Sequence, residues 1–448
     1  MSTLSIRTIQ TPDGSPVSFP NGIRTGSATG AGAVNNIGTP GQQGFGVGIA
    51  PQLPTNMVKL YGTEDPASDN YGNYQYSDGS VMCYVPAFFY KYGTGANGFG
   101  INVVDIKPFS AYADVATANA AGYALHRAFY NGGSIRPGFF VDKYLCSKNG
   151  SVASSLKNGV VLTSATRGGL AASPFSSIGQ ADAFYGAIGA ARTRGAAFHP
   201  KTQFENAALA LLANAHASAS TGTTYCAWYS AGSTNFPKGN NNNALGDSND
   251  GTIAYVWDGN AAYAGCGKTG SANFFAKTTH NGQNCGIADL NGLVWEIMPF
   301  GMTSNGTNFY LLNTAADVTA MTSGNTLATD AWGAAGLAAL YTNIGATYEA
   351  LTASNSNKTF GSASQVLSEA TSGTAWAMAG AGVPLVGGTG GSNQFGNDYF
   401  YDARPNELCP LSGAYWANAL LAGVWALLCD NVRGDSHDSC GFRSALYL

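Results

Sequence analysis

The sequence has 448 residues, of which 45% are hydrophobic and 10% charged, with a formal net charge of −4 at pH 7. A chain of this length and hydrophobic content can bury a core, which excludes a disordered protein. Because the charge is slightly negative and Lys and Arg form no basic stripe, a nucleic-acid partner is not predicted. Sixty Gly beside so few charges are typical of a turn-rich surface protein.

Neither a membrane span nor a metal-binding cysteine pattern is evident. The first residues, MSTLSIRTIQTPDGS, contain no basic segment followed by an apolar one. No apolar run approaches the roughly 20 residues that a membrane span needs. We therefore expect neither signal-peptide export nor membrane insertion. The eight Cys lie far apart without a CxxC pair and the five His are isolated, so we expect buried thiols rather than a zinc site or disulfide framework.

The amino-terminal part predicts an arm followed by two strands. Residues 1–50 are Gly-rich with little to bury, which predicts a flexible linker or an arm that docks onto a larger assembly. The aromatic run from Gly79 to Gly93 predicts a strand, which Pro86 would place at a sheet edge or a bulge. A second strand, with side chains alternating between its faces, is predicted within residues 134–150.

Two helices are predicted next, and loops follow them. The stretch from residue 198 to 217 has apolar residues at the spacing of one buried helical face, namely Phe204, Ala207, Ala208, Leu211 and Leu212. Thr202 and Glu205 have the spacing of a capping box at its start. The earlier stretch GQADAFYGAIGAARTRG predicts a helix whose glycines lower its propensity. From about residue 220 onward, long loops carry aromatic residues, and such loops are usually functional.

The last stretch, residues 411–448, reads as two interleaved sets of residues. One set has the small and large residues that a packed turn needs: Gly413, Trp416, Gly423, Val424, Ala426, Gly441, Phe442 and Arg443. The other set shares no polarity, period or size: Ala417, Asn418, Leu420, Leu421, Leu428, Asp430, Asn431, Asp435, His437 and Asp438. The first set predicts a tightly packed backbone frame for this segment. No structural pattern accounts for the second set.

Several segments resemble one family in the same order along the chain. They are YVPAFFY, GFFVDKYLCSKNG, HPKTQFENAA, GIADLNGLVWEI and the terminal SGAYW…GFRSAL, which together span about Gly79 to Leu448. They resemble landmarks of the C-type-lectin fold of the formylglycine-generating-enzyme type. The final segment also resembles the variable region of proteins diversified by retroelements, a family that includes the phage tropism determinants.

This resemblance implies a fold and a domain organisation. The fold would be α+β and C-type-lectin-like, loop-rich, with two helices and short antiparallel strands. A Gly-rich amino-terminal region, residues 1–50, would precede a receptor-binding domain with insertions over residues 51–448. Residues 411–448 would be the variable segment.

The resemblance also assigns roles within residues 411–448. Scaffold positions would be Trp416, Gly423, Val424, Ala426, Gly441, Phe442 and Arg443. The ligand-binding, variable surface would consist of Tyr415, Ala417, Asn418, Leu420, Leu421, Leu428, Asp430, Asn431, Asp435, His437 and Asp438. Since the leucines among them sit without strand alternation, some would form an exposed apolar patch. The alternative is that this segment only completes a β-rich core with polar loops.

The same family contains copper-dependent oxidases, so an enzyme has to be considered. Their copper chemistry needs two thiolates, and Ala417 and Ala422 stand at the matching positions. No GxSxG elbow or phosphate-binding loop occurs, so the sequence predicts a protein that is not an enzyme and requires no cofactor. A calcium ion held by Asp289 and Glu296 is implied by the oxidase relatives. The alternative is that Glu296 only accepts hydrogen bonds from loop amides.

The function implied is that of a phage tail-fibre or tail-tip receptor-binding protein that determines host tropism. Its partners would be a host cell-surface receptor, protein or glycan, and other tail or virion proteins. It would be a homotrimer, located in the virion and assembled in the host bacterial cytoplasm. The alternatives are a bacterial surface or secreted lectin-like protein diversified by a retroelement, and a structural virion protein without a receptor role.

Overall fold

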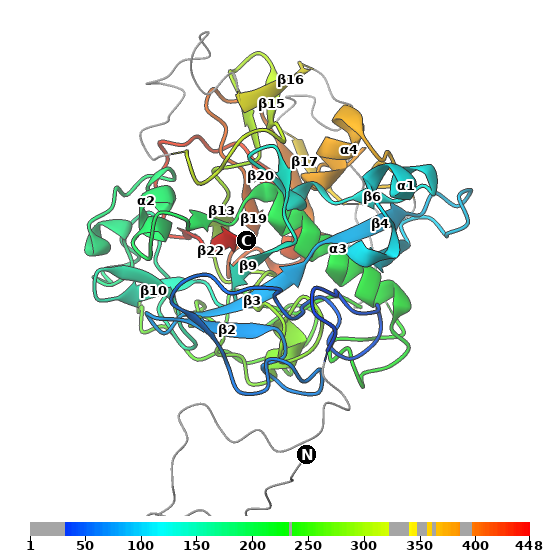
Figure 1. Cartoon of the computed structure of the whole chain (residues 1–448). Coiled ribbons are helices and arrows are strands. Elements are labelled where there is room, and N and C mark those ends of the chain that lie inside the picture. The colour runs from blue at the N-terminus through cyan, green and yellow to red at the C-terminus, as the bar shows by residue number, and fades with distance from the viewer. Residues whose placement is uncertain (1–31, 233–234, 322–339, 347–355, 361–363, 386–396) are drawn as a thin grey trace, which may run out of the picture.

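The computed structural model describes residues 32–448 except 233–234, 322–339, 347–355, 361–363 and 386–396. It has few helices, many short strands and long loops, which is the α+β class that the sequence predicts (Figure 1). The α-helices are α1 (Val115–Ala120), α2 (Gly186–Arg192), α3 (Gln203–Ala219) and α4 (Gly373–Gly380). Single 3-10 turns are η1 (Phe109–Ala111), η2 (Arg127–Phe129), η3 (Phe175–Ile178), η4 (Phe275–Thr278) and η6 (Ala419–Leu421).

Two six-stranded sheets form the centre of the molecule. The first has the order β1 (Met57–Lys59), β2 (Asn73–Tyr76), β3 (Val81–Pro86), β9 (Gly138–Asp142), β22 (Ser444–Tyr447) and β12 (His199–Pro200). The second has the order β17 (Ser356–Thr359), β18 (Tyr399–Asp402), β20 (Gly423–Cys429), β19 (Leu411–Gly413), β13 (Trp295–Ile297) and β21 (Cys440–Gly441). Residues 411–448 therefore contribute three strands to the second sheet, β19, β20 and β21, and one strand, β22, to the first.

Smaller sheets and hairpins surround these two sheets. One three-stranded sheet contains β5 (Val104–Pro108), β4 (Phe88–Tyr92) and β6 (Ala124–Leu125), and another contains β14 (Met302–Ser304), β15 (Phe309–Leu312) and β16 (Tyr341–Gly345). The hairpins are β7 (Tyr130–Asn131) with β8 (Ser134–Ile135), and β10 (Cys146–Asn149) with β11 (Val152–Ser155). Most pairings are antiparallel, and the parallel pairs are β18 with β20 and β13 with β21.

The strand predicted around Pro86 exists, but its place in the sheet was predicted wrongly. The run forms two strands, β3 and β4, which separate at Ala87 and enter different sheets. β3 is an inner strand, paired with β2 and β9, and Pro86 is its last residue. A proline is tolerated there because the strand ends at it. The second predicted strand is β9, and its side chains alternate as predicted between two faces. Both faces are buried, with Phe139 and Val141 in the main core cluster and Phe140 in the second.

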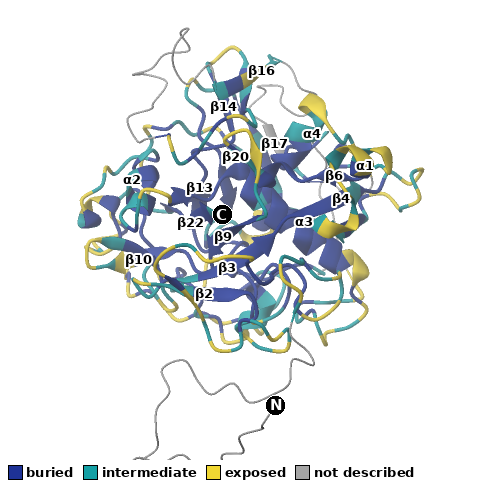
Figure 2. Cartoon of the chain, viewed as in Figure 1, coloured by how far each residue is buried: buried dark blue, intermediate teal, exposed yellow. Residues whose placement is uncertain are grey.

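Helix α3 is the longer predicted helix, and its cap is the predicted capping box. The Thr202 hydroxyl accepts a hydrogen bond from Glu205 N at 3.1 Å, and the Glu205 carboxylate accepts one from Thr202 N at 2.7 Å. The prediction of one buried face was too narrow, since most of α3 is buried on all sides between β5, β20 and α4 (Figure 2). The predicted Gly-containing helix is α2, and α1 and α4 are additional.

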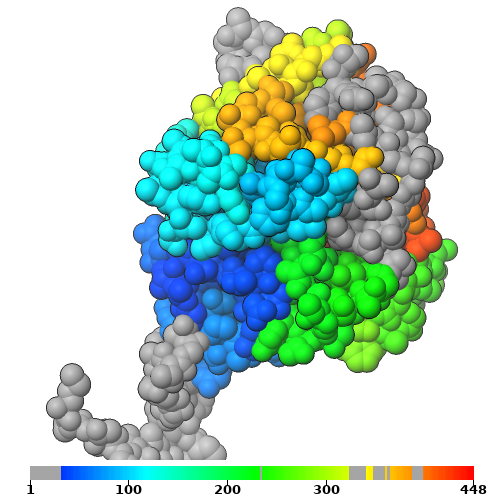
Figure 3. Space-filling model, turned by 90° about the vertical axis from the view of Figure 1, so that its right-hand side faces the viewer, coloured from blue at the N-terminus to red at the C-terminus, as the bar shows by residue number. Residues whose placement is uncertain are grey.

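The boundary predicted at residue 50 does not coincide with the edge of the core. Residues 1–31 lie outside the described residues, but Ile37, Phe45 and Val47 are fully buried in the main hydrophobic cluster. The Phe45 ring stacks on His216 of α3 at 5.3 Å between centroids. Figure 3 shows this part of the surface, where the blue amino-terminal segment lies against the green segment that follows α3. A few apolar residues among the glycines suffice to anchor this segment.

The predicted burial of the thiols is confirmed, because all eight cysteines are free and buried. Between α3 and η4, the residues that the structure describes form no named helix or strand. Among the described residues, no helix is long and apolar enough to cross a membrane.

Candidate functional site

The terminal segment, residues 411–448, divides into buried and accessible positions along the two sets that the sequence suggests. The structure buries every residue of the first set, namely Gly413, Trp416, Gly423, Val424, Ala426, Gly441, Phe442 and Arg443. It leaves every residue of the second set half-buried or exposed, namely Ala417, Asn418, Leu420, Leu421, Leu428, Asp430, Asn431, Asp435, His437 and Asp438, and Tyr415 of the implied variable surface is half-buried as well. Ala419, Gly434 and Ser436 are also exposed, although the sequence analysis did not include them.

Strand β20 shows how the frame residues come to be buried. Trp425 and Leu427 belong to the main core cluster, while Ala426 belongs to a second cluster on the other face of the strand. Leu428 continues this second face and is half-buried there. The expectation that Leu428 sits outside any strand alternation was therefore wrong. The alternation is invisible in the sequence because both faces of β20 carry apolar residues.

Each frame glycine lies where a side chain would either clash with a neighbour or strain the backbone. A Cβ on Gly423 would lie 1.8 Å from the Asp398 carboxylate, and one on Gly441 would lie 2.7 Å from the Leu162 carbonyl oxygen. Gly413 has a φ of +86°, in the left-handed region that favours glycine. The close packing of these backbones keeps the terminal segment in one conformation.

Arg443 joins the end of the terminal segment to three other parts of the chain. Its guanidinium donates to Glu296 in β13, with Nε at 2.7 Å from Oε2 and Nη2 at 2.9 Å from Oε1. It also donates to the carbonyl oxygens of Asp142, at 3.1 Å, and Ala288, at 2.8 Å. Burial opposes the charge of Arg443, but the carboxylate of Glu296 outweighs burial and raises the Arg443 pKa.

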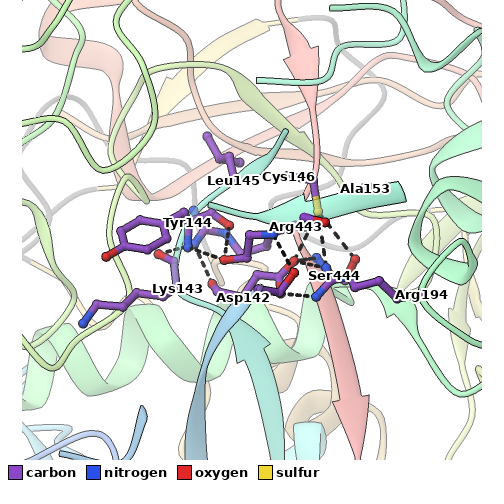
Figure 4. A network of polar contacts seen from close by, with 12 residues as sticks. Asp142, Lys143, Tyr144, Leu145, Cys146, Ala153, Arg194, Arg443 and Ser444 are labelled. Atoms are coloured by element: carbon purple, nitrogen blue, oxygen red, sulfur yellow. Dashed lines mark hydrogen bonds and ion pairs between the residues drawn. The ribbon is translucent and has the colours of Figure 1, made fainter. Parts of the chain in front are cut away.

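The next residue, Ser444, is held by a second buried ion pair. Ser444 N donates to Asp142 Oδ2 at 2.8 Å, and Arg194 pairs with both oxygens of the same carboxylate. Cys146 Sγ lies 3.2 Å from Asp142 Oδ2 in this cluster. Figure 4 shows Arg443, Ser444 and Asp142 side by side where β9 meets the carboxyl-terminal strand. The terminal segment therefore ends in a fully buried polar network.

Trp416 and Phe442 are the large side chains of the frame. The Trp416 indole is 3% exposed and packs against the rings of Tyr415 and Tyr263, at 4.9 Å and 5.2 Å between centroids. Phe442 is fully buried and meets Phe175 edge to face at 5.4 Å. Each ring thus ties the segment to a neighbouring loop.

The accessible side chains are held by local hydrogen bonds. Asp435 accepts hydrogen bonds from Val432 N at 2.7 Å and from Asn431 Nδ2 at 3.2 Å. Tyr263 OH donates to Asp438 Oδ2. Leu420 and Leu421, on η6, are 45% and 37% exposed. The result is a fixed surface that mixes acids, amides and aliphatic groups.

The two carboxylates suggested for calcium are already engaged with other groups of the chain. Asp289 accepts hydrogen bonds from Gly270 N at 2.7 Å, Thr269 Oγ1 at 2.8 Å and Tyr255 OH at 3.2 Å. Both oxygens of Glu296 face cations, since Lys201 Nζ lies 2.8 Å from Oε2 beside the Arg443 pair.

Burial raises the pKa of Glu296, but the charges of Arg443 and Lys201 lower it by more, so the net shift of the pKa is downward. A calcium ion would have to displace these two cations, so the residues present do not fit a calcium site at this position. Among the described residues, no group of three or more His, Cys, Asp or Glu is arranged to hold a metal.

The positions of the oxidase thiols are occupied by side chains that cannot bind copper. Ala417 is half-buried and Ala422 is 4% exposed. The nearby Cys409 is fully buried, and burial raises its pKa to about 12. A thiol that stays protonated is a poor ligand for copper.

Residues outside the terminal segment also lie at its accessible surface, and the sequence analysis missed them. They include Tyr263, which contacts Asp438, and Tyr401, which is the register partner of Leu428. Tyr399 stacks on Tyr401 at 6.0 Å between centroids. No local pattern marks these tyrosines, because only the tertiary fold brings them to the segment.

Comparison with known proteins adds structural neighbours but no sequence relative. No family model and no curated protein matches the chain. Three solved structures that resemble it are variants of the major tropism determinant.

The M1 variant is 13% identical with a TM-score of 0.29, and the match covers 82% of this chain and 63% of that chain. The U1 variant is 12% identical with a TM-score of 0.30, covering 83% of this chain and 65% of that chain. The P3c variant is 14% identical with a TM-score of 0.29, covering 89% of this chain and 73% of that chain. The chain thus spans less than two thirds of the M1 and U1 variants. Identities and TM-scores this low do not assign a function. The function proposed below rests on the chain's own residues.

Proposed function

We propose that the protein is a phage tail receptor-binding protein whose terminal segment displays a diversifiable surface that determines host tropism. The observation that carries this proposal is the separation within residues 411–448. Every residue of the first set, the frame, is buried, and every residue of the second set is at least partly exposed. A binding protein that changes specificity without losing its fold needs this arrangement, because exposed substitutions usually cost little stability.

The proposal includes the surroundings of this surface. The domain would be C-type-lectin-like, and the protein would be a homotrimer in the tail tip or fibre, attached to other virion proteins through its amino-terminal region. It would act by binding rather than by catalysis, since Ala417 and Ala422 stand where the oxidase chemistry needs thiols. A bacterial lectin-like protein would use the same surface. A reverse-transcriptase gene beside tail genes, with a near-duplicate of the 3′ end of this gene, would distinguish the phage protein.

Substitution of the surface tests the proposal directly. The variant in which Asn431, Asp435, His437 and Asp438 are all replaced by Ala is expected to lose adsorption to host cells. Its melting temperature should stay close to that of the wild type, because none of the four is buried. Adsorption is measured by depletion of labelled protein on host cells. Full adsorption by this variant would show that the binding surface lies elsewhere.

Two frame variants provide the matched control. Trp416→Ala and Phe442→Ala remove side chains that are 3% and 0% exposed, so each should cost about 3 to 5 kcal/mol of stability. They are expected to lower the melting temperature sharply. Below their melting temperatures their adsorption should follow the folded fraction.

A further inference from the structure

A long loop outside the terminal segment has a defined conformation without regular secondary structure. Residues 235–274, here called the outer loop, contain no helix or strand among the described residues, and a single bridge joins Trp257 to Gly267. Loops of this length are usually functional when they are ordered. Contacts other than those of helices and sheets must therefore hold the outer loop in its conformation.

Buried polar side chains supply this order. Asn240 donates to the carbonyl oxygens of Ala244 and Gly265, at 2.7 Å and 3.0 Å, and accepts from Gly267 N at 2.8 Å. Asn240 is fully buried. Such side-chain bonds to the backbone replace the ladder of a sheet.

A buried ion pair and a set of hydrogen bonds attach the outer loop to the rest of the molecule. Asp258 forms an ion pair with Arg167 at 2.7 Å, and both side chains are fully buried. Asp289 receives hydrogen bonds from Thr269 and Gly270 of the loop. The acid that the sequence suggests for calcium thus fixes the end of this loop.

The outer loop runs directly beside the terminal segment. Asn243 N donates to the Trp416 carbonyl oxygen at 2.7 Å, and Ala419 N donates to the Asn241 carbonyl oxygen at 2.6 Å. Farther along, the Tyr263 hydroxyl donates to Asp438. The loop therefore contacts the segment at Trp416, at η6 and near the segment's last turn.

The outer loop also exposes large apolar side chains. Val256 is 51% exposed and Trp257 is 43% exposed. The Trp257 Nε1 donates to the Asn260 carbonyl oxygen at 3.3 Å, and Tyr263 N donates to the same oxygen at 3.1 Å. The exposed indole is thus held in place near Tyr263. A rigid aromatic group provides contact area at a low cost in conformational entropy, as in antibody paratopes.

We propose that the outer loop, through Trp257, Val256 and Tyr263, forms a constant part of the receptor-binding surface for a protein receptor. This inference rests on the proposed function of the terminal segment and adds residues that the retroelement would not diversify. The constant part supplies apolar contact, and the terminal segment supplies the contacts that select one receptor.

The chemistry of the combined surface indicates which partner it fits. Val256, Leu420 and Leu421 are exposed aliphatic side chains, which gain free energy against apolar protein groups and offer nothing to sugar hydroxyls. In the terminal segment, Asp430 and Asp438 are accessible while both arginines, Arg433 and Arg443, are buried. The complementary surface is therefore a protein patch with apolar side chains flanked by Lys or Arg.

Substitutions in the outer loop test this proposal. Trp257→Ala is expected to lower adsorption to host cells about tenfold, the effect of losing an interface hot spot. Tyr263→Phe, which frees Asp438, should also lower it. Tyr61→Ala is the matched control, because Tyr61 is an aromatic side chain that is 76% exposed in the turn between β1 and β2. All three variants should melt like the wild type.

The outcomes separate this inference from the proposed function. If Trp257→Ala and Tyr263→Phe adsorb like Tyr61→Ala while the four-residue variant of the terminal segment does not adsorb, the outer loop is not part of the surface and the proposed function stands. If the four-residue variant adsorbs fully, the proposed function itself fails. Protease treatment of the host cells should abolish adsorption and periodate oxidation of their glycans should not. The reverse result overturns the protein receptor.

Discussion

The Arg443 guanidinium and the Glu296 carboxylate form a two-point ion pair inside the core, with N to O distances of 2.7 Å and 2.9 Å. Neither side chain is more than 2% exposed. Glu296 lies in β13 of the second sheet, and Arg443 immediately precedes β22 of the first sheet. The pair therefore connects the end of the terminal segment, at the start of β22, to the second sheet.

We expect the loss of either partner to destabilise the protein strongly. Glu296→Gln would leave the buried charges of Arg443 and Lys201 without their partner, and Arg443→Met would leave Glu296 with Lys201 alone. Breaking a buried ion pair typically costs about 3 to 5 kcal/mol, and the Arg443 variant should lose less because Lys201 remains. Chemical denaturation with urea measures the free energy of unfolding of each variant. The double variant should lose less than the sum of the two single losses, because the two groups interact directly. Additive losses would contradict a direct pair.

The same pair leads to a prediction about calcium. A ligand that binds only the folded state raises stability by RT ln(1 + [L]/Kd), about 2.7 kcal/mol at a hundredfold excess over Kd. Because Glu296 is engaged by Arg443 and Lys201, we expect the melting temperature to be equal in calcium and in chelator. Asp289→Ala should be less stable in both buffers. A rise with calcium that Asp289→Ala abolishes would restore the calcium site.

Local chemistry in the sequence predicted some elements well. The capping box of Thr202 and Glu205 depends on residues three apart, and its two hydrogen bonds are present in the structure. The frame of the terminal segment was also visible, since glycines and large aromatics in one short stretch indicate tight packing. These signals act over a few residues, so they need no knowledge of the tertiary fold.

Other features depend on contacts between distant residues, and the sequence did not reveal them. Phe45 is buried because α3 presents His216 to it, although the sequence around Phe45 is mostly glycine. The outer loop is ordered by buried amides such as Asn240, which in the sequence are indistinguishable from the solvated amides of a flexible loop. Calcium at Glu296 was implied by the oxidase relatives, and the sequence did not show that Arg443, far along the chain, pairs with this carboxylate.

Glu205 predicts a pH dependence of stability. Burial raises its pKa from 4.5 to about 8, although the hydrogen bonds from Thr202 oppose this rise. The neighbouring groups are His199, whose Nε2 lies 3.8 Å from Oε1, Lys201, and Tyr447 of β22. Because the folded state binds this proton more tightly than the unfolded state, the contribution of Glu205 to stability is complete below pH 4.5 and is lost as the pH rises through 8.

Glu205→Gln, which keeps a side-chain oxygen for the Thr202 amide, should flatten this part of the pH profile. The measurement is the free energy of unfolding of both proteins by urea between pH 5 and about 9. The other buried acids and histidines remain in both proteins, so the difference between the two profiles isolates Glu205. Parallel profiles would show that Glu205 does not change its protonation between the folded and unfolded states.

Gly423 and Asp398 give the sharpest test of the frame. Asp398 is 4% exposed and accepts a hydrogen bond from Trp425 N at 2.9 Å, which places its carboxyl group over Gly423. In Gly423→Ala the new methyl group would lie 1.8 to 2.1 Å from the three carboxyl atoms, so β20 or Asp398 has to move. We expect a loss of about 1 to 3 kcal/mol or more from this overpacking.

Asp398→Ala alone should cost about 1 to 3 kcal/mol, because the buried Trp425 amide loses its acceptor. Adding it to Gly423→Ala removes the atoms that clash, so the double variant should be more stable than the sum of the single losses predicts. Urea denaturation of the four proteins completes this cycle. If the two losses simply add, the Asp398 carboxyl group is not what requires glycine at position 423, and the fixed frame needs another explanation at the start of β20.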